Sequence, residues 1–143
     1  MAGRLLKGAR KCLYALEKRT NPQYVEFDAV QSLGATDAKV LLIASDNDTV
    51  VRKEHHFEVL QRALGGKENI RFLLTEGKGH NPSYTCDAVC CKDAFFAEFQ
   101  RRVKKKQLET PAQQKVFMDT FDWYRMTEQD EVVWEAIVQH LES

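Results

Sequence analysis

Two short stretches decide the fold of this 143-residue chain. Residues 39–51 read KVLLIASDNDTVV, a nearly continuous apolar run that leads into the turn-forming cluster Asp46-Asn47-Asp48. Residues 70–82 read IRFLLTEGKGHNP, a second apolar run that is closed by a glycine-rich loop. A short apolar run with β-branched members is typical of a strand that is buried on both faces, as in a parallel sheet.

A helix is predicted between the two strands, because Phe57, Leu60 and Leu64 repeat at helical spacing before Gly65-Gly66 ends the pattern. The order strand, helix, strand is one βαβ unit, whose crossover is right-handed. The sequence therefore predicts the α/β class, with a short parallel sheet, flanking helices and a helical C-terminus.

Three patterns predict the C-terminal helices. Val89, Phe96 and Val103 recur every seven residues. Thr110 with the proline after it combines an N-cap with the residue favoured at the first helical position. Thr127 opens another capping-box pattern ahead of the last helix. The residues predicted to share the buried face of that helix are Val133, Ala136, Ile137, His140 and Leu141.

Residues 1–26 are predicted to be helical, with apolar residues on one face and basic residues on the other. The stretch Thr20-Asn21-Pro22 ends the helix, because the residue before a proline disfavours helical geometry. A cationic amphipathic helix can lie on a membrane or act as a targeting sequence. The modest apolar face of this one lacks Trp and Phe, which favours a surface helix packed on its own domain.

The 21 Lys and Arg residues balance the 21 Asp and Glu residues, so the formal net charge is zero. This balance gives no general attraction to nucleic acid or to an anionic membrane, and the basic run at residues 101–106 is interpreted as a solvated helix end. No apolar run approaches bilayer-spanning length. The four cysteines form no regular framework and no signal peptide is recognisable, so we predict a cytoplasmic protein with free thiols.

Two residues follow the predicted strands at the edge where a parallel sheet presents functional groups. Asp48 follows the first strand, and His80 follows the second, 32 residues later. With one crossover helix between them, the two strand ends are expected to be neighbours. An aspartate in this position can accept the Nδ1 proton of the imidazole, fix its tautomer and stabilise the imidazolium. Asp46 shares the turn and is an alternative acid.

The segments LLIASDNDTVV and EGKGHNP together resemble the second half of the α/β-hydrolase superfamily, over residues from about Phe27 to the last helix. The triad of that family runs nucleophile, acid, histidine along the chain. The resemblance implies that Asp48 is the acid, ahead of Asp46, and that His80 is the histidine. It also implies a single partial domain, 1–143, in which residues 1–26 are the end of the cap region and 27–143 are the acid and histidine half of the core.

The nucleophile of that family is missing. It lies in a G-x-S-x-G elbow upstream of the acid, and neither Ser32 nor Ser45 has glycines in that pattern. The cysteines at 86, 90 and 91 follow the histidine in a predicted helix without an elbow, so they are poor candidates. The strands that form the rest of the sheet are missing too. Met1 is then either an internal methionine of a longer protein or the start of a shortened one.

The resemblance implies part of a serine-type hydrolase that cleaves an ester, thioester or similar acyl bond of a small molecule. It implies no cofactor and no metal, and the adjacent His55 and His56 would point in different directions on a helix, which disfavours a metal site. Without a nucleophile and an oxyanion hole the chain alone is expected to be nearly inactive. The alternative is a non-catalytic interaction module or subunit, whose exposed sheet edge pairs with a second copy or a complementing chain.

Overall fold

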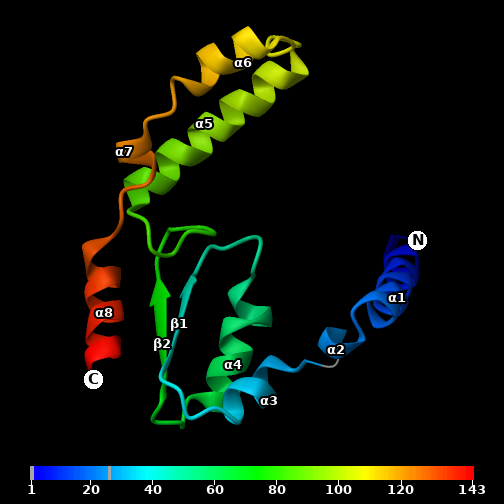
Figure 1. Cartoon of the computed structure of the whole chain (residues 1–143), viewed down its shortest axis with the longest axis vertical. Coiled ribbons are helices and arrows are strands. Elements are labelled where there is room, and N and C mark those ends of the chain that lie inside the picture. Colours follow the sequence, from blue (N-terminus) through cyan, green and yellow to red (C-terminus); the bar gives the residue numbers. More distant parts are fainter. Residues whose placement is uncertain (1, 26) are drawn as a thin grey trace. The chain divides into compact units, whose positions relative to one another are not determined.

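The computed structural model describes residues 2–25 and 27–143. The chain divides into two compact units, Met1–Ala38 and Lys39–Ser143 (Figure 1). The sequence is interpreted as one partial domain with a boundary after residue 26, and that residue lies outside the described part. The structure divides the chain further along, after Ala38.

The first unit contains the helices α1 (Ala2–Thr20), α2 (Pro22–Val25) and α3 (Ala29–Gly34). Helix α1 ends at Thr20, as predicted from the proline at position 22. Helix α3, which sequence analysis does not predict, begins after Asp28, whose carboxylate accepts hydrogen bonds from two backbone N–H groups of the first turn. Leu13 and Leu16 of α1 are 63% and 56% exposed.

The second unit contains a parallel two-stranded sheet of β1 (Val40–Ser45) and β2 (Ile70–Thr75). The register pairs the first residues of the two strands with each other and the last residues with each other, so both strands end at the same level. The crossover between them contains η1 (Lys53–His55) and α4 (Phe57–Leu64). The predicted mixed α/β class with a short parallel sheet is confirmed, and both strands and their crossover helix lie where the sequence predicts them.

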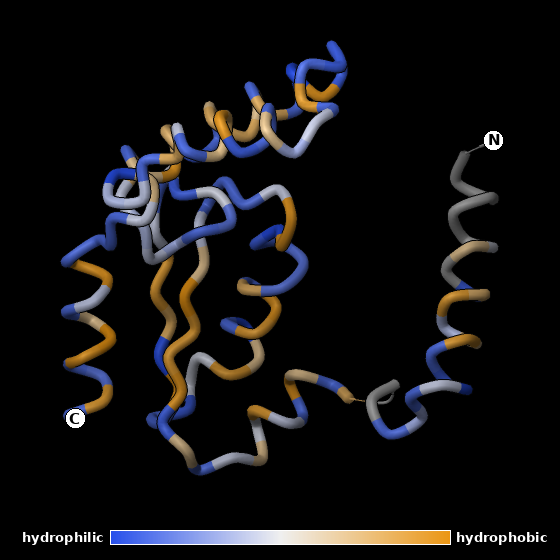
Figure 2. Tube along the Cα trace, turned by 45° about the horizontal axis from the view of Figure 1, so that its top comes forward, coloured by the Kyte–Doolittle hydropathy of each residue, from blue (hydrophilic) through white to orange (hydrophobic). Residues whose placement is uncertain are grey.

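The sheet is less buried than the sequence predicts. Both strands are largely apolar along their length (Figure 2), a pattern typical of strands covered on both faces. Yet residues 40–44 of β1 are only partly buried, and Leu74 of β2 is 44% exposed. The sheet that the structure describes has only two strands, so each of them is an edge strand. The prediction of full burial on both faces is therefore wrong for the sheet in this chain.

The rest of the second unit is helical and contains α5 (Cys86–Lys104), α6 (Pro111–Met118), α7 (Trp123–Met126) and α8 (Glu131–Glu142). Residues 86–127, which carry α5, α6 and α7, are called the helical arm below (Figure 1). The buried cluster of the arm consists of Phe95, Leu108, Phe117 and Met126. The rings of Phe95 and Phe117 stack with 4.7 Å between their centroids. Thr110 caps α6 in a complete capping box with Gln113, as predicted.

The start of α8 differs from the prediction. Thr127 does not cap this helix, because it lies directly after α7. The backbone between them is held extended by an antiparallel bridge between Tyr84 and Gln129, so the helix begins only beyond it. Asp130 is the residue that caps α8, and its Oδ1 accepts a hydrogen bond from the N–H of Val133 at 3.2 Å.

Helix α8 lies beside β2 (Figures 1 and 2). Val133 and His140 of its predicted inner face are buried, whereas Leu141 is 71% exposed and does not belong to that face. Both ring nitrogens of His140 are buried without a hydrogen-bond partner among the described residues. None of the helices in residues 2–25 and 27–143 combines the length and the apolar character that crossing a bilayer requires.

Candidate active site

The candidate site is formed by the two loops at the C-terminal ends of β1 and β2. Because the strands are parallel and in register, residues 46–48 after β1 and residues 76–80 after β2 emerge at the same edge of the sheet. The N–H of Asp46 donates to the carbonyl oxygen of Thr75 at 2.9 Å, which continues the strand pairing one residue into the loop. The sheet thus brings together two segments that are far apart in the sequence.

Asp48 and His80, the two residues predicted from sequence, are in direct contact. The distance from His80 Nδ1 to Asp48 Oδ2 is 2.9 Å. The other carboxylate oxygen, Oδ1, accepts hydrogen bonds from the backbone N–H groups of Val50 at 2.8 Å and Val51 at 2.9 Å. The Asp48 side chain is only 9% exposed, whereas that of His80 is 55% exposed. The carboxylate is therefore fixed from three directions, while the imidazole is open to whatever approaches it.

The surroundings of Asp48 favour its charged form. Burial raises the pKa of this carboxyl, but the hydrogen bonds from His80, Val51 and Val50 together hold it below its usual value of 3.8. The group is therefore a carboxylate near neutral pH, and a carboxylate can only accept hydrogen bonds. When the imidazole is neutral, Nδ1 must then carry the proton, which leaves the Nε2 lone pair available as a base.

Asp46, the alternative acid, makes a different contact. Its Oδ1 accepts a hydrogen bond from the N–H of Gly77 at 2.8 Å and thereby holds the loop that carries the histidine. The carboxylate that His80 contacts is the one at position 48. The geometry thus separates the two aspartates of the turn into one partner of the imidazole and one support of its loop.

Two further residues of the first loop, which sequence analysis does not identify, bind the second loop. Asn47 Oδ1 accepts hydrogen bonds from the N–H of Gly79 at 2.7 Å and from the hydroxyl of Ser45 at 2.9 Å. Ser45 Oγ in turn accepts from the N–H of Lys78 at 3.0 Å. Each of the four consecutive residues 45–48 therefore bonds to the loop at 77–80. The only sequence feature that could indicate these contacts is the run of polar turn residues at 45–48, and a polar turn alone does not predict which distant segment it binds.

The conformation of the second loop explains its two glycines. Gly77 has a φ of 72° and Gly79 has a φ of 53°, both in the left-handed region where a Cβ is unfavourable. These two residues turn the chain back over the end of the sheet. The position of His80 depends on this turn.

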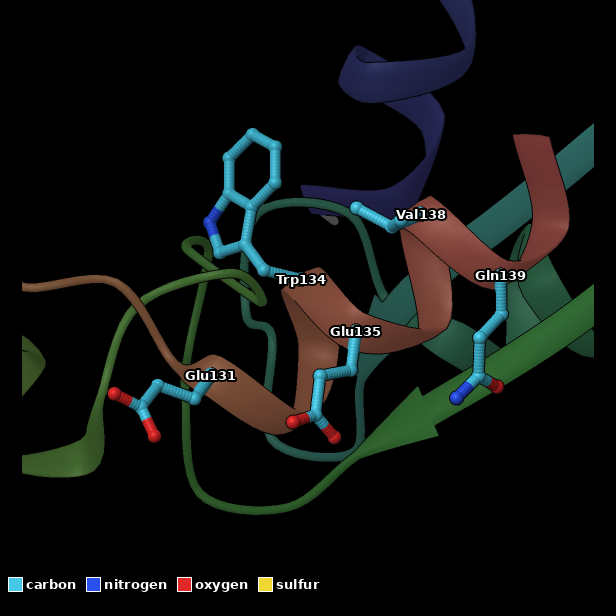
Figure 3. Close-up of a pocket in the computed structure, with 5 residues that line it drawn as sticks. All are labelled: Glu131, Trp134, Glu135, Val138 and Gln139. Atoms are coloured by element: carbon cyan, nitrogen blue, oxygen red, sulfur yellow. The ribbon is translucent and has the colours of Figure 1, made fainter. Parts of the chain in front are cut away.

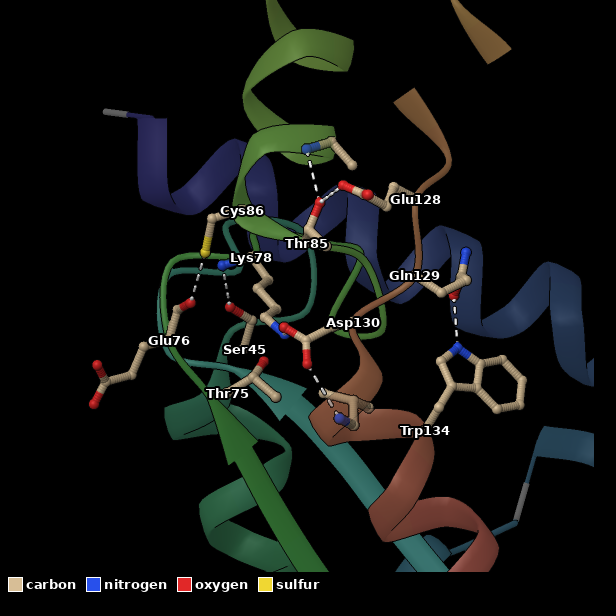
Figure 4. Close-up of polar contacts among 12 residues, drawn as sticks. Ser45, Thr75, Glu76, Lys78, Thr85, Cys86, Glu128, Gln129, Asp130 and Trp134 are labelled. Atoms are coloured by element: carbon tan, nitrogen blue, oxygen red, sulfur yellow. Dashed lines mark hydrogen bonds and ion pairs between the residues drawn. The ribbon is translucent and has the colours of Figure 1, made fainter. Parts of the chain in front are cut away.

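Lys78, between the two glycines, is a buried cation that the sequence gives no reason to single out. Its side chain is 7% exposed, and Nζ contacts Asp130 Oδ2 at 2.5 Å (Figure 4). The hydrogen bond from Lys78 holds the pKa of Asp130 below 3.8, despite the opposing effect of burial. A buried charge of this kind requires a partner, and Asp130 supplies it.

The serine and cysteine nearest the two loops make contacts other than with His80. Ser45 is 1% exposed, and its hydroxyl is occupied by Asn47 and Lys78. The thiol of Cys86 contacts the carbonyl oxygen of Glu76 at 3.6 Å. The cysteines at 90 and 91 lie further along α5. The structure thus brings together the predicted acid and histidine, while the hydroxyl of Ser45 and the thiol of Cys86 are engaged elsewhere.

Other groups in the described residues do not form a competing centre. No three His, Cys, Asp or Glu side chains of this part of the chain gather as metal ligands would. A pocket on α8 is lined by Glu131, Trp134, Glu135, Val138 and Gln139 (Figure 3). This lining contains no histidine, so the carboxylate–imidazole pair of the candidate site has no equivalent there.

No family model, no curated protein and no solved structure matches this chain. The candidate site therefore rests on its own geometry.

Proposed function

We propose that residues 39–143 form the acid and histidine part of a serine-type hydrolase related to the α/β-hydrolase superfamily. The observation that carries this proposal is the contact between His80 Nδ1 and Asp48 Oδ2 at 2.9 Å, at the C-terminal edge of two neighbouring parallel strands. An imidazole whose Nδ1 is held by a fixed carboxylate and whose other side is open has the geometry of a general base.

The proposed reaction is cleavage of an ester, thioester or similar acyl bond of a small molecule. His80 Nε2 takes the proton of a nucleophilic hydroxyl as that oxygen attacks the acyl carbon, and the same nitrogen later protonates the leaving group. Asp48 remains ionised and stabilises the imidazolium between these two steps. The hydroxyl and the oxyanion hole come from a part of the enzyme outside these residues.

Two measurements on the chain itself test this proposal. The Nδ1 proton of His80 is expected to give a slowly exchanging NMR signal that disappears in Asp48→Asn and persists in Asp46→Asn. The chain alone is expected to show no esterase turnover above that of an Asp48→Asn control. Robust turnover that depends on His80 would contradict the proposal that the nucleophile lies elsewhere.

A further test addresses the missing nucleophile. The coding sequence upstream of Met1 is expected to encode, in frame, a strand, a G-x-S-x-G elbow and a helix. A protein that includes this segment is expected to react with a fluorophosphonate probe at the elbow serine, and to do so much more slowly after His80→Ala. A stop codon with no elbow upstream would count against the hydrolase proposal.

One observation favours a second candidate function, an interaction module or subunit. The N–H of Val40 donates to Asn69, directly before β2, and that of Asp46 donates to Thr75 at the end of β2. The odd-numbered residues of β1 between them therefore direct their backbone groups to the opposite edge. That strand, Val40–Ser45, contains neither a charged residue nor a proline, the residues that usually protect an edge from pairing. We expect the edge to pair with a second copy or with a complementing chain. A monomer at all accessible concentrations in size-exclusion chromatography would argue against it.

A further inference from the structure

The loop that carries His80 has little stiffness of its own. Gly77 and Gly79 flank Lys78, and glycine restricts the backbone less than any other residue. The imidazole of His80 is 55% exposed, so packing of neighbouring side chains does not fix the ring. Its position must follow from the path of the loop and from the hydrogen bond to Asp48.

Asp130 offers this loop a fixed anchor on another part of the unit. Its N–H donates to the carbonyl oxygen of Ser83 at 2.8 Å, and its Oδ1 caps α8 through the N–H of Val133. The residue before it belongs to the bridge between Gln129 and Tyr84, at the base of the helical arm. Both the backbone and one carboxylate oxygen are thereby held in place, and the second oxygen is directed at Lys78.

The connection from this anchor to His80 is short. Lys78 Nζ binds Asp130 Oδ2 at 2.5 Å, with the lysine side chain 7% exposed (Figure 4). The backbone N–H of the same lysine donates to Ser45 Oγ at 3.0 Å. Lys78 is therefore held at both its backbone and the end of its side chain, two residues before the histidine.

We propose that Lys78 and Asp130 are positioning residues that hold the His80 loop in the conformation in which Nδ1 meets Asp48. The catalytic meaning of this role rests on the proposed function, but the role itself can be measured on the imidazole without any substrate. The ion pair links the start of α8, next to the helical arm, to the loop that carries His80. The backbone hydrogen bonds of this loop are then not the only interactions that hold its conformation.

If the ion pair served stability alone, removing both charges together would leave the His80 proton exchange unchanged. Replacing a buried ion pair by uncharged groups of similar shape often leaves stability nearly unchanged, whereas removing one partner alone leaves an unpaired buried charge. The double variant Lys78→Met/Asp130→Asn removes both charges. Methionine keeps the length and apolar stem of the lysine, and asparagine remains a good N-cap for α8. This variant is expected to fold with a melting temperature close to that of the parent chain.

The experiment compares the Nδ1 proton of His80 in selectively labelled protein, with the signal assigned by its absence in His80→Gln. In the double variant we expect exchange of this proton with water to be about tenfold faster, the factor expected when a charge-assisted hydrogen bond no longer restrains the loop. The matched control is Lys115→Met/Asp119→Asn, which removes an ion pair at the C-terminal end of α6 whose side chains are 75% and 60% exposed. Exchange in this control is expected to equal that of the parent.

The outcomes separate the inference from the proposed function. Unchanged exchange in a folded double variant would overturn the positioning role, while loss of the signal in Asp48→Asn would still support the acid and base pair. A parent chain whose His80 exchange does not respond to Asp48→Asn would overturn the pair and the inference with it. If the single variant Lys78→Met unfolds, the double variant still decides the question, because it contains no unpaired buried charge.

Discussion

Replacement of Phe117 by alanine is expected to unfold the helical arm selectively. The Phe117 side chain is 4% exposed and stacks on Phe95, with a ring-centroid separation of 4.7 Å and an interplanar angle of 23°. It also lies 5.8 Å from the Phe99 ring centroid, and the Arg102 guanidinium lies 5.0 Å above its face. Truncation of a buried phenylalanine costs about 3–5 kcal/mol, and with two ring partners lost we expect about 4 kcal/mol.

Hydrogen exchange followed by mass spectrometry measures this effect segment by segment. Peptides from α5 and α6 are expected to exchange up to about a thousandfold faster in Phe117→Ala, since each 1.4 kcal/mol is about tenfold. Peptides from β1 and β2 are expected to change much less, because the arm has a buried cluster of its own. The control is Val116→Ala on the same helix, where the side chain is 69% exposed and the cost is expected to be below about 0.5 kcal/mol. A cost under about 1 kcal/mol for Phe117→Ala, or equal acceleration in the strands, would refute the reasoning.

Three further predictions concern the loops and caps. The pKa values of Asp48 and Asp130 are lowered in the folded chain. Their contribution to stability is therefore fully present above about pH 5 and is lost as the pH falls below about 4. Urea titrations at several pH values should show this loss of stability, and a smaller loss in Asp48→Asn. Gly79→Ala is expected to lower the free energy of unfolding by about 1 kcal/mol in a thermal denaturation assay. The φ of 53° is unfavourable for alanine, although the added Cβ makes only ordinary contacts. Unchanged stability would show that the loop relaxes freely. Thr110→Ala should destabilise α6 by about 1 kcal/mol in the same assay, since the hydroxyl caps the first turn, and Thr110→Ser should restore most of it.

The strands and the acid and base pair could be predicted because each has a local pattern with a physical cause. The apolar runs ending at Ser45 and Thr75 contain no charge pattern typical of a surface helix, and both form strands that end where predicted. Once two parallel strands are adjacent, residues just beyond their ends must be neighbours, which is why Asp48 and His80 could be paired from sequence. The choice between Asp48 and Asp46 rested on the resemblance, because both lie in one turn.

The supports of the site could not be predicted, because they depend on contacts between distant segments. Nothing local distinguishes Lys78 from any lysine in a surface loop, since its burial is produced by Asp130, which lies 52 residues later. The start of α8 differs from the sequence prediction for a related reason. Thr127 has the better local capping pattern, but the bridge between Tyr84 and Gln129 keeps the chain extended past it, and tertiary structure overrides the local preference.

Burial is predicted incorrectly for the two-stranded sheet that the structure describes. The run Val40–Ala44 has the composition of a strand covered on both faces, yet its residues are only partly buried. Composition describes the environment to which a strand is suited, whereas exposure is determined by the neighbours that are present. A mismatch of this kind between composition and exposure is what we expect of a strand whose remaining neighbours belong to another segment or another chain.

The number of contacts between the two loops of the candidate site supports the hydrolase proposal over a simple solvated turn. A solvated turn after a strand needs only local hydrogen bonds to its own backbone. Here residues 45–48 all bond across to the second loop, and a buried lysine ties that loop to Asp130. Such extensive fixation of the loop that carries an exposed imidazole is difficult to explain unless the geometry of His80 matters. The tenfold acceleration expected for Lys78→Met/Asp130→Asn tests that explanation directly on the imidazole of His80.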